Sequence, residues 1–197
     1  DSAIGSIDNA MMIPKEATYP KNQKTNIFYE RSGYVSIGSA HYTKALNNNG
    51  ITWKILPDHG RTGDAITTFP VTAPAQHPGS NAPHLQYEVH TYSSGDCKIS
   101  AYFSPTLNFH NTEEGLQYAI SVDDEAPQII SINAEDKNTG RGIWNKWVSE
   151  NIIIKTTNHK IAKPGKHIVK YWMVNSGVVL QQLVLEFGAQ PGYLGPP

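Results

Sequence analysis

The chain has 197 residues, in which 16 Lys and Arg face 17 Asp and Glu, so its formal net charge is -1. A chain of this length buries about 70% of the surface that it exposes when unfolded, which predicts one domain with an ample core. The weak charge is spread thinly, which excludes nucleic acid and anionic membranes as expected partners. No apolar run reaches the length that a membrane-spanning helix needs.

The first 32 residues differ in composition from the rest of the chain. They contain Pro14 and Pro20 among several Asn residues, and their only apolar cluster is Met11–Ile13. This composition predicts an extended N-terminal lead-in or linker over residues 1–32, with few core contacts, followed by a β-sandwich domain over residues 33–197. Because neither a basic nor an apolar leader pattern follows Asp1, we expect a mature or excised piece.

From residue 33 onward, short apolar and alternating runs are separated by turn residues, as is typical of a β-sandwich. The clearest is a hairpin in which Leu116–Val122 and Gln128–Ile132 flank the acidic turn Asp123–Pro127. With this pair, the predicted strands are Tyr34–Ile37, Thr52–Leu56, Ala65–Phe69, His84–Tyr92, Lys98–Phe103, Leu116–Val122, Gln128–Ile132, Ile152–Thr156, His167–Met173 and Val178–Phe187. The expected fold is all-β, a two-sheet antiparallel β-sandwich of jelly-roll-like form with one short helix.

The predicted helix follows the turn formers of residues 138–142. Ile143, Trp147, Val148 and Asn151 recur at helical spacing, and Trp144 lies one turn before Val148. We expect Trp147 to cover the core, and Trp144 either to do the same or to face solvent.

Motifs that indicate catalysis or metal binding are absent from the sequence. The eight His residues form neither H-E-x-x-H nor a Cys/His pair, and the Ser residues lack the G-x-S-x-G context. Asp123, Asp124 and Glu125 could supply calcium ligands or an acid and base, but adjacent carboxylates in a hairpin turn usually splay apart and stay solvated. Cys97, the only Cys, lies in a strand pattern, which favours a buried inert thiol over a nucleophile. We therefore predict no catalytic residue, no metal and no cofactor.

The aromatic and amide side chains suit the binding of sugars. The chain has ten Tyr, four Trp and many Asn and Gln residues in or beside loops. The C–H faces of sugars stack on aromatic rings, and sugar hydroxyls need fixed amide or carboxylate partners. The candidates from the residues alone are Trp53, Trp144, Tyr42 and Asn108. Aromatic residues also fill cores, so we assign Trp172 to the core and leave Trp53 open, because period-two alternation allows either face.

Five motifs, in order and at compatible spacing over about residues 28–197, give the chain a family resemblance. It resembles the C-terminal domain of glycoside hydrolase family 115, the xylan α-glucuronidases. The motifs are GYVSIGSAHYTKA, GRTGDAITTFPVTAP, YFSPTLNF, GLQYAISVDDEAPQIISIN and IAKPGKHIVKYWMVNSGVVLQQLVLEFGAQPGYLGPP.

The resemblance implies a β-sandwich accessory domain that is related to carbohydrate-binding modules and follows a catalytic barrel. The catalytic carboxylates belong to the preceding domains, so no residue of this chain inherits a catalytic role. In related modules the sugar site lies in the loops at one end, with a late Asn and one or two aromatic residues, or on the concave sheet face. The late loop VNSGVV places Asn175 at the matching position. The resemblance also implies a bacterial protein that is secreted, periplasmic or at the cell surface.

A second likeness concerns a structural ion. Residues 37–42 align with the I-E-A-E-x-Y start of calcium-carrying sandwich modules, but both carboxylates are missing here, so we expect no metal at this position.

Two functions remain open on these grounds. The first is a non-catalytic carbohydrate-binding module for xylan or glucuronoxylan, attached to the catalytic domain of a parent enzyme. The second is a structural domain that supports the catalytic domain or a dimer without binding sugar. An exposed apolar patch would indicate this second function. An independent hydrolase is the least favoured interpretation.

Overall fold

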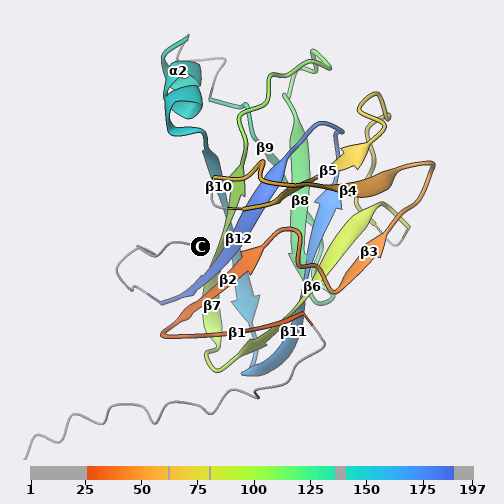
Figure 1. The fold of residues 1–197 in the computed structure, drawn as a ribbon. Helices are drawn as coiled ribbons and strands as arrows, with labels where there is room; N and C mark the ends of the chain where they lie inside the picture. Colours follow the sequence, from red (N-terminus) through yellow and green to blue (C-terminus); the bar gives the residue numbers. More distant parts are fainter. Residues whose placement is uncertain (1–25, 62, 80, 136–140, 189–197) are drawn as a thin grey trace, which may run out of the picture.

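Two β-sheets pack face to face in the computed structural model, which describes residues 26–61, 63–79, 81–135 and 141–188 (Figure 1). Sheet A has the order β1-β6-β11-β8-β9, and β3 also pairs with β6. Its strands are β1 (Ile27–Tyr29), β3 (Lys44–Leu46), β6 (His84–Thr91), β8 (Gln117–Val122), β9 (Gln128–Ser131) and β11 (Gly165–Met173).

Sheet B has the order β10-β7-β12-β5-β4, and β2 also pairs with β12. Its strands are β2 (Tyr34–Gly38), β4 (Thr52–Leu56), β5 (Ala65–Phe69), β7 (Gly95–Phe103), β10 (Ile153–Ile161) and β12 (Leu180–Phe187). The helix α2 (Arg141–Glu150) precedes β10. Within the described ranges all strand pairs are antiparallel except β1 with β6. The expected two-sheet antiparallel sandwich is confirmed, and the described residues contain one short helix.

All ten predicted strands form, and two short strands, β1 and β3, were not predicted. Strand β1 lies inside the segment that the sequence marks as a lead-in. It pairs with β6 in parallel, and Phe28 packs against the main core. Residues 1–25 of that segment lie outside the described residues, so the division of the chain at residue 33 stays a prediction.

The core forms where alternate side chains of the two sheets meet. In β6, Leu85, Tyr87 and Val89 are fully buried, while the side chains between them face outward. Tyr171 on β11 packs against rings from the opposite sheet, with its centroid 6.4 Å from that of Phe103. Each such large apolar side chain contributes about 1.5–3 kcal/mol through burial, which is why alternation fixes the register of the strands.

The helix packs only in part as its spacing predicted, because Val148, which that spacing groups with Trp147, is 52% exposed. Trp147 is buried in the main core, and Trp144 is partly buried against it, while Val148 faces solvent. No helix in the described part of the chain has the length and apolarity to cross a membrane.

Trp172 is buried as predicted, but in a small second cluster and not in the main core. Trp172 is 5% exposed, but it lies on the outer face of sheet A, in a small cluster with Ala82, Ala119 and Val174. Its Nε1 donates to Ser121 Oγ at 2.9 Å. The chain before Pro83 covers the ring, because the Met173 N–H donates to the Pro83 carbonyl and Ala82 packs on the indole.

Candidate functional site

Three connecting segments meet at one end of the sandwich, the end where α2 lies (Figure 1). They are residues 104–116 after β7, residues 174–179 between β11 and β12, and residues 70–73 after β5. The Ser104 N–H donates to the Val179 carbonyl, and Ser176 Oγ donates to the Val71 carbonyl at 2.6 Å. We call this surface the loop end.

An exposed aromatic ring lies on the backbone of the loop end. Phe109 is 50% exposed, and its ring covers Gly177, where a Cβ would be only 2.3 Å from Phe109 Cε1. The His110 ring packs against Phe109 with a centroid distance of 4.3 Å and an interplanar angle of 36°, and His110 Nε2 lies 2.9 Å from Ser176 Oγ. The ring of Phe109 is therefore both solvent-facing and held in place, which suits stacking against a flat ligand.

Asn175 lies two residues before Gly177 in the late loop, and it is 7% exposed. Its Oδ1 accepts from the Gln117 N–H at 2.9 Å, and its own N–H donates to the Gln117 carbonyl at 3.0 Å. The carboxamide is thereby fixed in orientation, and its Nδ2 makes no hydrogen bond with any described residue. A fixed, unused amide donor is a suitable partner for a hydroxyl of a ligand.

Asn108 plays a supporting part in the same surface. Its Nδ2 donates to the Thr112 carbonyl at 2.8 Å, and its Oδ1 accepts from the Thr112 N–H at 3.3 Å. Both ends of the amide are engaged within the loop, so Asn108 shapes residues 108–112 and holds the adjacent Phe109.

His110 and Ser176 are within hydrogen-bonding distance, as a base and a nucleophile would be. Ser176 is fully buried, and its hydroxyl donates its only proton to the Val71 carbonyl. His110 Nε2 then has to donate to Ser176 Oγ, which is the reverse of general-base geometry. The pair fastens two loops together.

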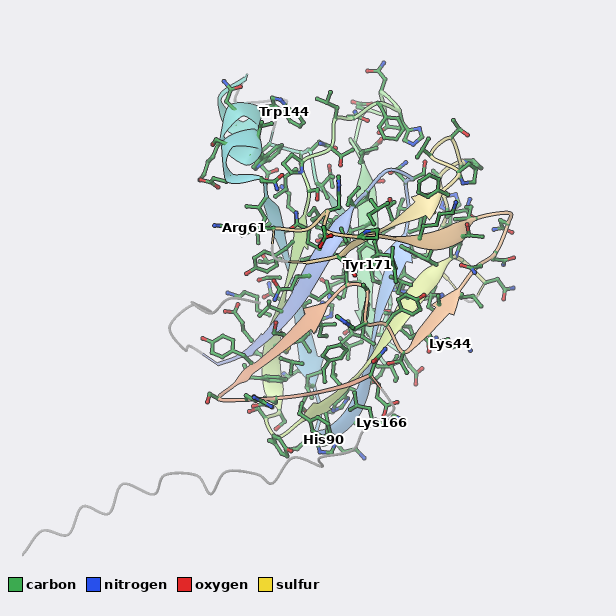
Figure 2. All side chains as sticks on the ribbon, viewed as in Figure 1. Lys44, Arg61, His90, Trp144, Lys166 and Tyr171 are labelled. Atoms are coloured by element: carbon green, nitrogen blue, oxygen red, sulfur yellow. The ribbon has the colours of Figure 1, made fainter. Side chains whose placement is uncertain are left out.

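The other three sequence candidates do not join this group. Trp53 faces the sandwich interior at its edge, where its ring packs on Tyr171 at 5.8 Å and its Nε1 donates to the Leu46 carbonyl. Tyr42 is half-buried against the main core. Trp144 lies on α2 and packs partly against the same core (Figure 2). The assignment of sugar-binding roles to these residues stays a prediction, as it does for Asn175 and Asn108.

Phe109 and His110 were not singled out from the sequence, although they adjoin Asn108 in the run Asn108–Asn111. An aromatic residue placed between turn formers is the signal that could have found them, because a loop ring without a strand pattern has no core position to fill.

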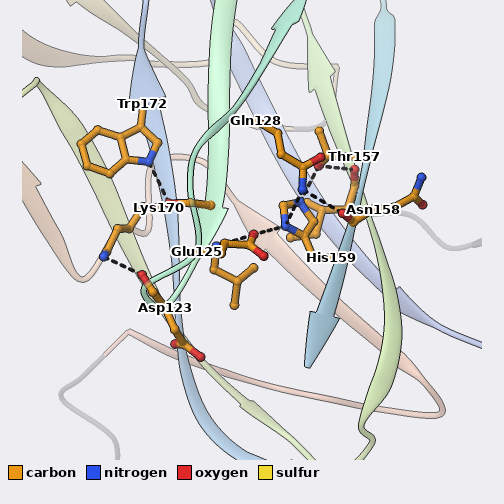
Figure 3. A network of polar contacts seen from close by, with 11 residues as sticks. Asp123, Glu125, Gln128, Thr157, Asn158, His159, Lys170 and Trp172 are labelled. Carbon is orange, nitrogen blue, oxygen red and sulfur yellow. Dashed lines mark hydrogen bonds and ion pairs between the residues drawn. The ribbon is translucent and has the colours of Figure 1, made fainter. Parts of the chain in front are cut away.

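The acidic turn departs in part from expectation (Figure 3). The carboxylates do splay apart, but two of them are engaged. Asp123 accepts from the Ile168 N–H and lies 2.7 Å from His167 Nδ1, whereas Glu125 accepts from the Val122 N–H and pairs with His159 Nδ1. Asp124 is exposed, and the Asp123 side chain keeps 47% of its surface exposed although it is hydrogen-bonded, whereas the Glu125 side chain is 30% exposed. The carboxylates of Asp123 and Asp124 therefore stay solvated as predicted, while that of Glu125 is partly buried against His159.

The buried thiol matches its predicted role. Cys97 is 1% exposed within β7, and burial raises the pKa of its thiol to about 12. The reactive thiolate is thus suppressed at neutral pH. In the part of the chain that the structure describes, no group of three or more His, Cys, Asp or Glu side chains is arranged to hold a metal ion.

The sequence matches a family model over residues 27–197, described as the glycosyl hydrolase family 115 C-terminal domain. The chain belongs to this family. The resemblance drawn from the five motifs is thereby confirmed. A search of curated proteins found no match.

Solved structures share the sandwich of this family 115 domain. A family 115 4-O-methyl-α-glucuronidase with specificity for decorated arabinogalactans superposes with a TM-score of 0.59 at 16% identity. The alignment covers 81% of this chain and 18% of that enzyme, so the chain spans less than a fifth of the enzyme's length.

Two smaller modules superpose less closely. The C-terminal family 6 carbohydrate-binding module of a laminarinase from Zobellia galactanivorans has a TM-score of 0.49 at 11% identity, covering 78% of this chain and 99% of that one. A family 35 carbohydrate-binding module from Clostridium thermocellum has a TM-score of 0.46 at 10% identity, covering 77% and 96%.

Proposed function

We propose that this domain is a non-catalytic carbohydrate-binding module that recognises xylan or glucuronoxylan and is attached to the catalytic domain of a parent enzyme. The polymers that it would bind are plant cell-wall polysaccharides. The proposal therefore includes a location outside the bacterial cytoplasm, as a secreted, periplasmic or cell-surface protein. Its role is to hold the enzyme near its polymer and so raise the effective concentration of the substrate.

The observation that carries the proposal is the Phe109 ring, which is half exposed and fixed on Gly177, two residues after Asn175 in the late loop. A sugar needs an apolar face and oriented hydrogen-bond donors side by side, and the loop end offers both. An open surface of this kind gives affinities of about 1 mM to 1 μM, or roughly -4 to -8 kcal/mol.

A structural accessory role is the second candidate, and one observation favours it. Leu107, Phe109 and Val71 are 60%, 50% and 45% exposed, and all three belong to the loop end. An apolar patch of this kind also fits a contact with another domain. In that case the Phe109 ring would be covered by protein in the parent enzyme.

Titration of the chain with xylan, glucuronoxylan and cello-oligosaccharides separates the two functions. We expect binding to the xylans, about tenfold weaker binding for Phe109→Ala because a stacked ring is worth about 1–1.5 kcal/mol, and a comparable loss for Asn175→Ala. Ile129→Ala is the matched control, because Ile129 is 49% exposed on β9, outside the loop end.

If none of the xylans produces binding heat, a spectral shift or retardation in a gel, the structural role is favoured over sugar binding. Release of sugar from glucuronoxylan, or turnover of aryl esters, by the chain alone would contradict the non-catalytic assignment.

A further inference from the structure

The outer face of sheet A carries cations that the loop end does not use. Strands β3 and β11 flank β6, and their register places Lys44 and Lys170 on either side of Gln86. Neighbouring strands lie about 4.8 Å apart, so the Cα atoms of the two Lys residues are about 10 Å apart with Gln86 between them. All three side chains point away from the core, because Leu85 and Tyr87 on either side of Gln86 are fully buried. We call Lys44, Gln86 and Lys170 the cationic row.

The polar groups of the cationic row are fixed in orientation. His84 Nδ1 lies 2.8 Å from the Ala82 carbonyl and must donate to it, so His84 Nε2 accepts from Gln86 Nε2 at 3.0 Å. This leaves Gln86 Oε1 as an outward acceptor. Lys170 Nζ donates to the Asp123 carbonyl at 2.7 Å, which anchors the ammonium and keeps two of its donors available (Figure 3).

The charge of the cationic row is not neutralised within the described part of the chain. Lys166, four residues from Lys170 along β11, pairs with Glu88 at 2.7 Å, but no carboxylate pairs with Lys44 or Lys170 there. Burial holds the pKa of His84 below its ordinary value, and the charges of Lys170 and Lys44 lower it further. His84 is therefore neutral at neutral pH, and the positive charge of the row comes from the two ammonium groups.

Aromatic rings continue the same face beyond the cationic row. The Tyr29 and His90 rings lie 5.5 Å apart, and the Tyr92 ring lies 5.3 Å from His90. Tyr92 is 49% exposed. We call these three residues the aromatic strip. His90 is four residues from Gln86 along β6, a distance of about 13 Å that an oligosaccharide can span.

The position of this face in the molecule separates it from the loop end. Figure 2 shows Lys44, His90 and Lys166 on one side of the molecule and Trp144 at the opposite end.

We propose that the cationic row and the aromatic strip form a second glycan-binding surface, selective for chains that carry uronic acid groups. The inference rests on the proposed carbohydrate-binding function and names the class of polymer that the domain prefers. Lys44 and Lys170 bind the carboxylate of the uronic acid, and Gln86 Oε1 accepts from one of its hydroxyls. A neighbouring sugar of the same chain stacks on the aromatic strip.

Calorimetric titration of the whole chain tests this selectivity with two ligands of equal backbone length. One is an unsubstituted xylo-oligosaccharide, and the other carries a single 4-O-methylglucuronosyl group. We expect the acidic ligand to bind about 5-fold to 10-fold more tightly at low salt, because two exposed ion pairs add a modest attraction. This difference in affinity should shrink as salt is added, since salt screens exposed charges. In the double variant Lys44→Gln, Lys170→Gln, both ligands should bind equally.

Lys160→Gln is the matched control, since Lys160 is an exposed Lys on β10 of sheet B and should leave the preference unchanged. Thermal unfolding of each variant verifies that it folds. Equal affinity of the wild-type chain for both ligands would overturn the inference and leave sugar binding intact. A preference that persists in the double variant would also overturn it, whereas binding of neither ligand would remove the proposed function itself.

Discussion

Gly177 is the residue that allows the Phe109 ring to lie on the late loop. Its φ is +83, in the left-handed region, and the space of a Cβ is already filled by the ring. We predict that Gly177→Ala lowers the free energy of unfolding by about 1–3 kcal/mol, because it combines left-handed backbone with overpacking. The same change should displace Phe109 and weaken sugar binding. Urea denaturation and titration with xylan measure the two effects.

Gly50→Ala provides the control for this prediction. Gly50 has a φ of +73, but a Cβ added to it would have no atom within 4 Å, so its substitution adds backbone strain alone. The double variant Gly177→Ala, Phe109→Ala also lacks the ring. It should therefore regain the part of the lost free energy of unfolding that the clash with the ring causes. Equal losses at Gly50 and Gly177 would contradict the steric role of the ring.

The same pair of residues explains why the loop end was only partly predicted from sequence. The late position of Asn175 was enough to single it out, through the family resemblance. The role of Phe109 depends on its contact with Gly177, a residue 68 positions later, so no local pattern around Asn108 reveals it. Conversely, Trp53 looked like a binding residue because alternation leaves its face open, and only the contact with Tyr171 places it toward the interior.

At the scale of elements, the acidic turn between β8 and β9 joins strands of both sheets. His159 on β10 has a side chain that is fully buried, and Glu125 is its partner while also accepting from the Val122 N–H. We predict that Glu125→Ala lowers the free energy of unfolding by about 2 kcal/mol, because it leaves the buried Val122 N–H without a partner and leaves His159 Nδ1 with only Gln128 Nε2, 3.4 Å away. Asp124→Ala should change it by less than about 0.5 kcal/mol, since Asp124 is exposed and makes no such contact.

Guanidinium denaturation of the two variants compares them directly. Similar losses for Glu125→Ala and Asp124→Ala would show that the turn is solvated as a whole, as the sequence suggested, and that the contact with His159 contributes little to stability.

Strand β10 shows where sequence patterns fail for elements. Only residues 152–156 were expected to be extended, yet β10 runs from Ile153 to Ile161. Its inward positions include Lys155, Thr157 and His159, which are polar and so hide the alternation. Their partners Glu135, the Ile99 carbonyl and Glu125 come from elsewhere in the chain. Strands β1 and β3 were missed for a different reason, because three residues are too few to display a period of two.

At the scale of the whole molecule, sheet A and the loop end present different chemistry to a polymer. The loop end offers a fixed ring and a neutral amide, and the outer face of sheet A offers the two ammonium groups of the cationic row beside three rings. Because β11 contributes Lys170 and leads directly into the loop of Asn175, one rigid strand connects both surfaces. A polymer that contacts both would gain affinity through linkage, without any new contact.

The extent of the folded domain is a property of the whole chain, and β1 is the element that decides it. Phe28 packs on the main core, and Glu30, which is 5% exposed, accepts from the N–H groups of Tyr92 and Ser93. We predict that a chain starting at residue 33 is less stable than one starting at residue 26 by about 2–4 kcal/mol, because it loses a buried aromatic side chain and leaves two N–H groups unpaired. Guanidinium denaturation of the two chains measures the difference in stability. The variant Glu30→Gln in the longer chain measures how much of that difference comes from the Glu30 carboxylate. Equal stability of the two truncated chains would instead support the boundary at residue 33, with β1 as a strand that pairs with β6 but contributes nothing to folding.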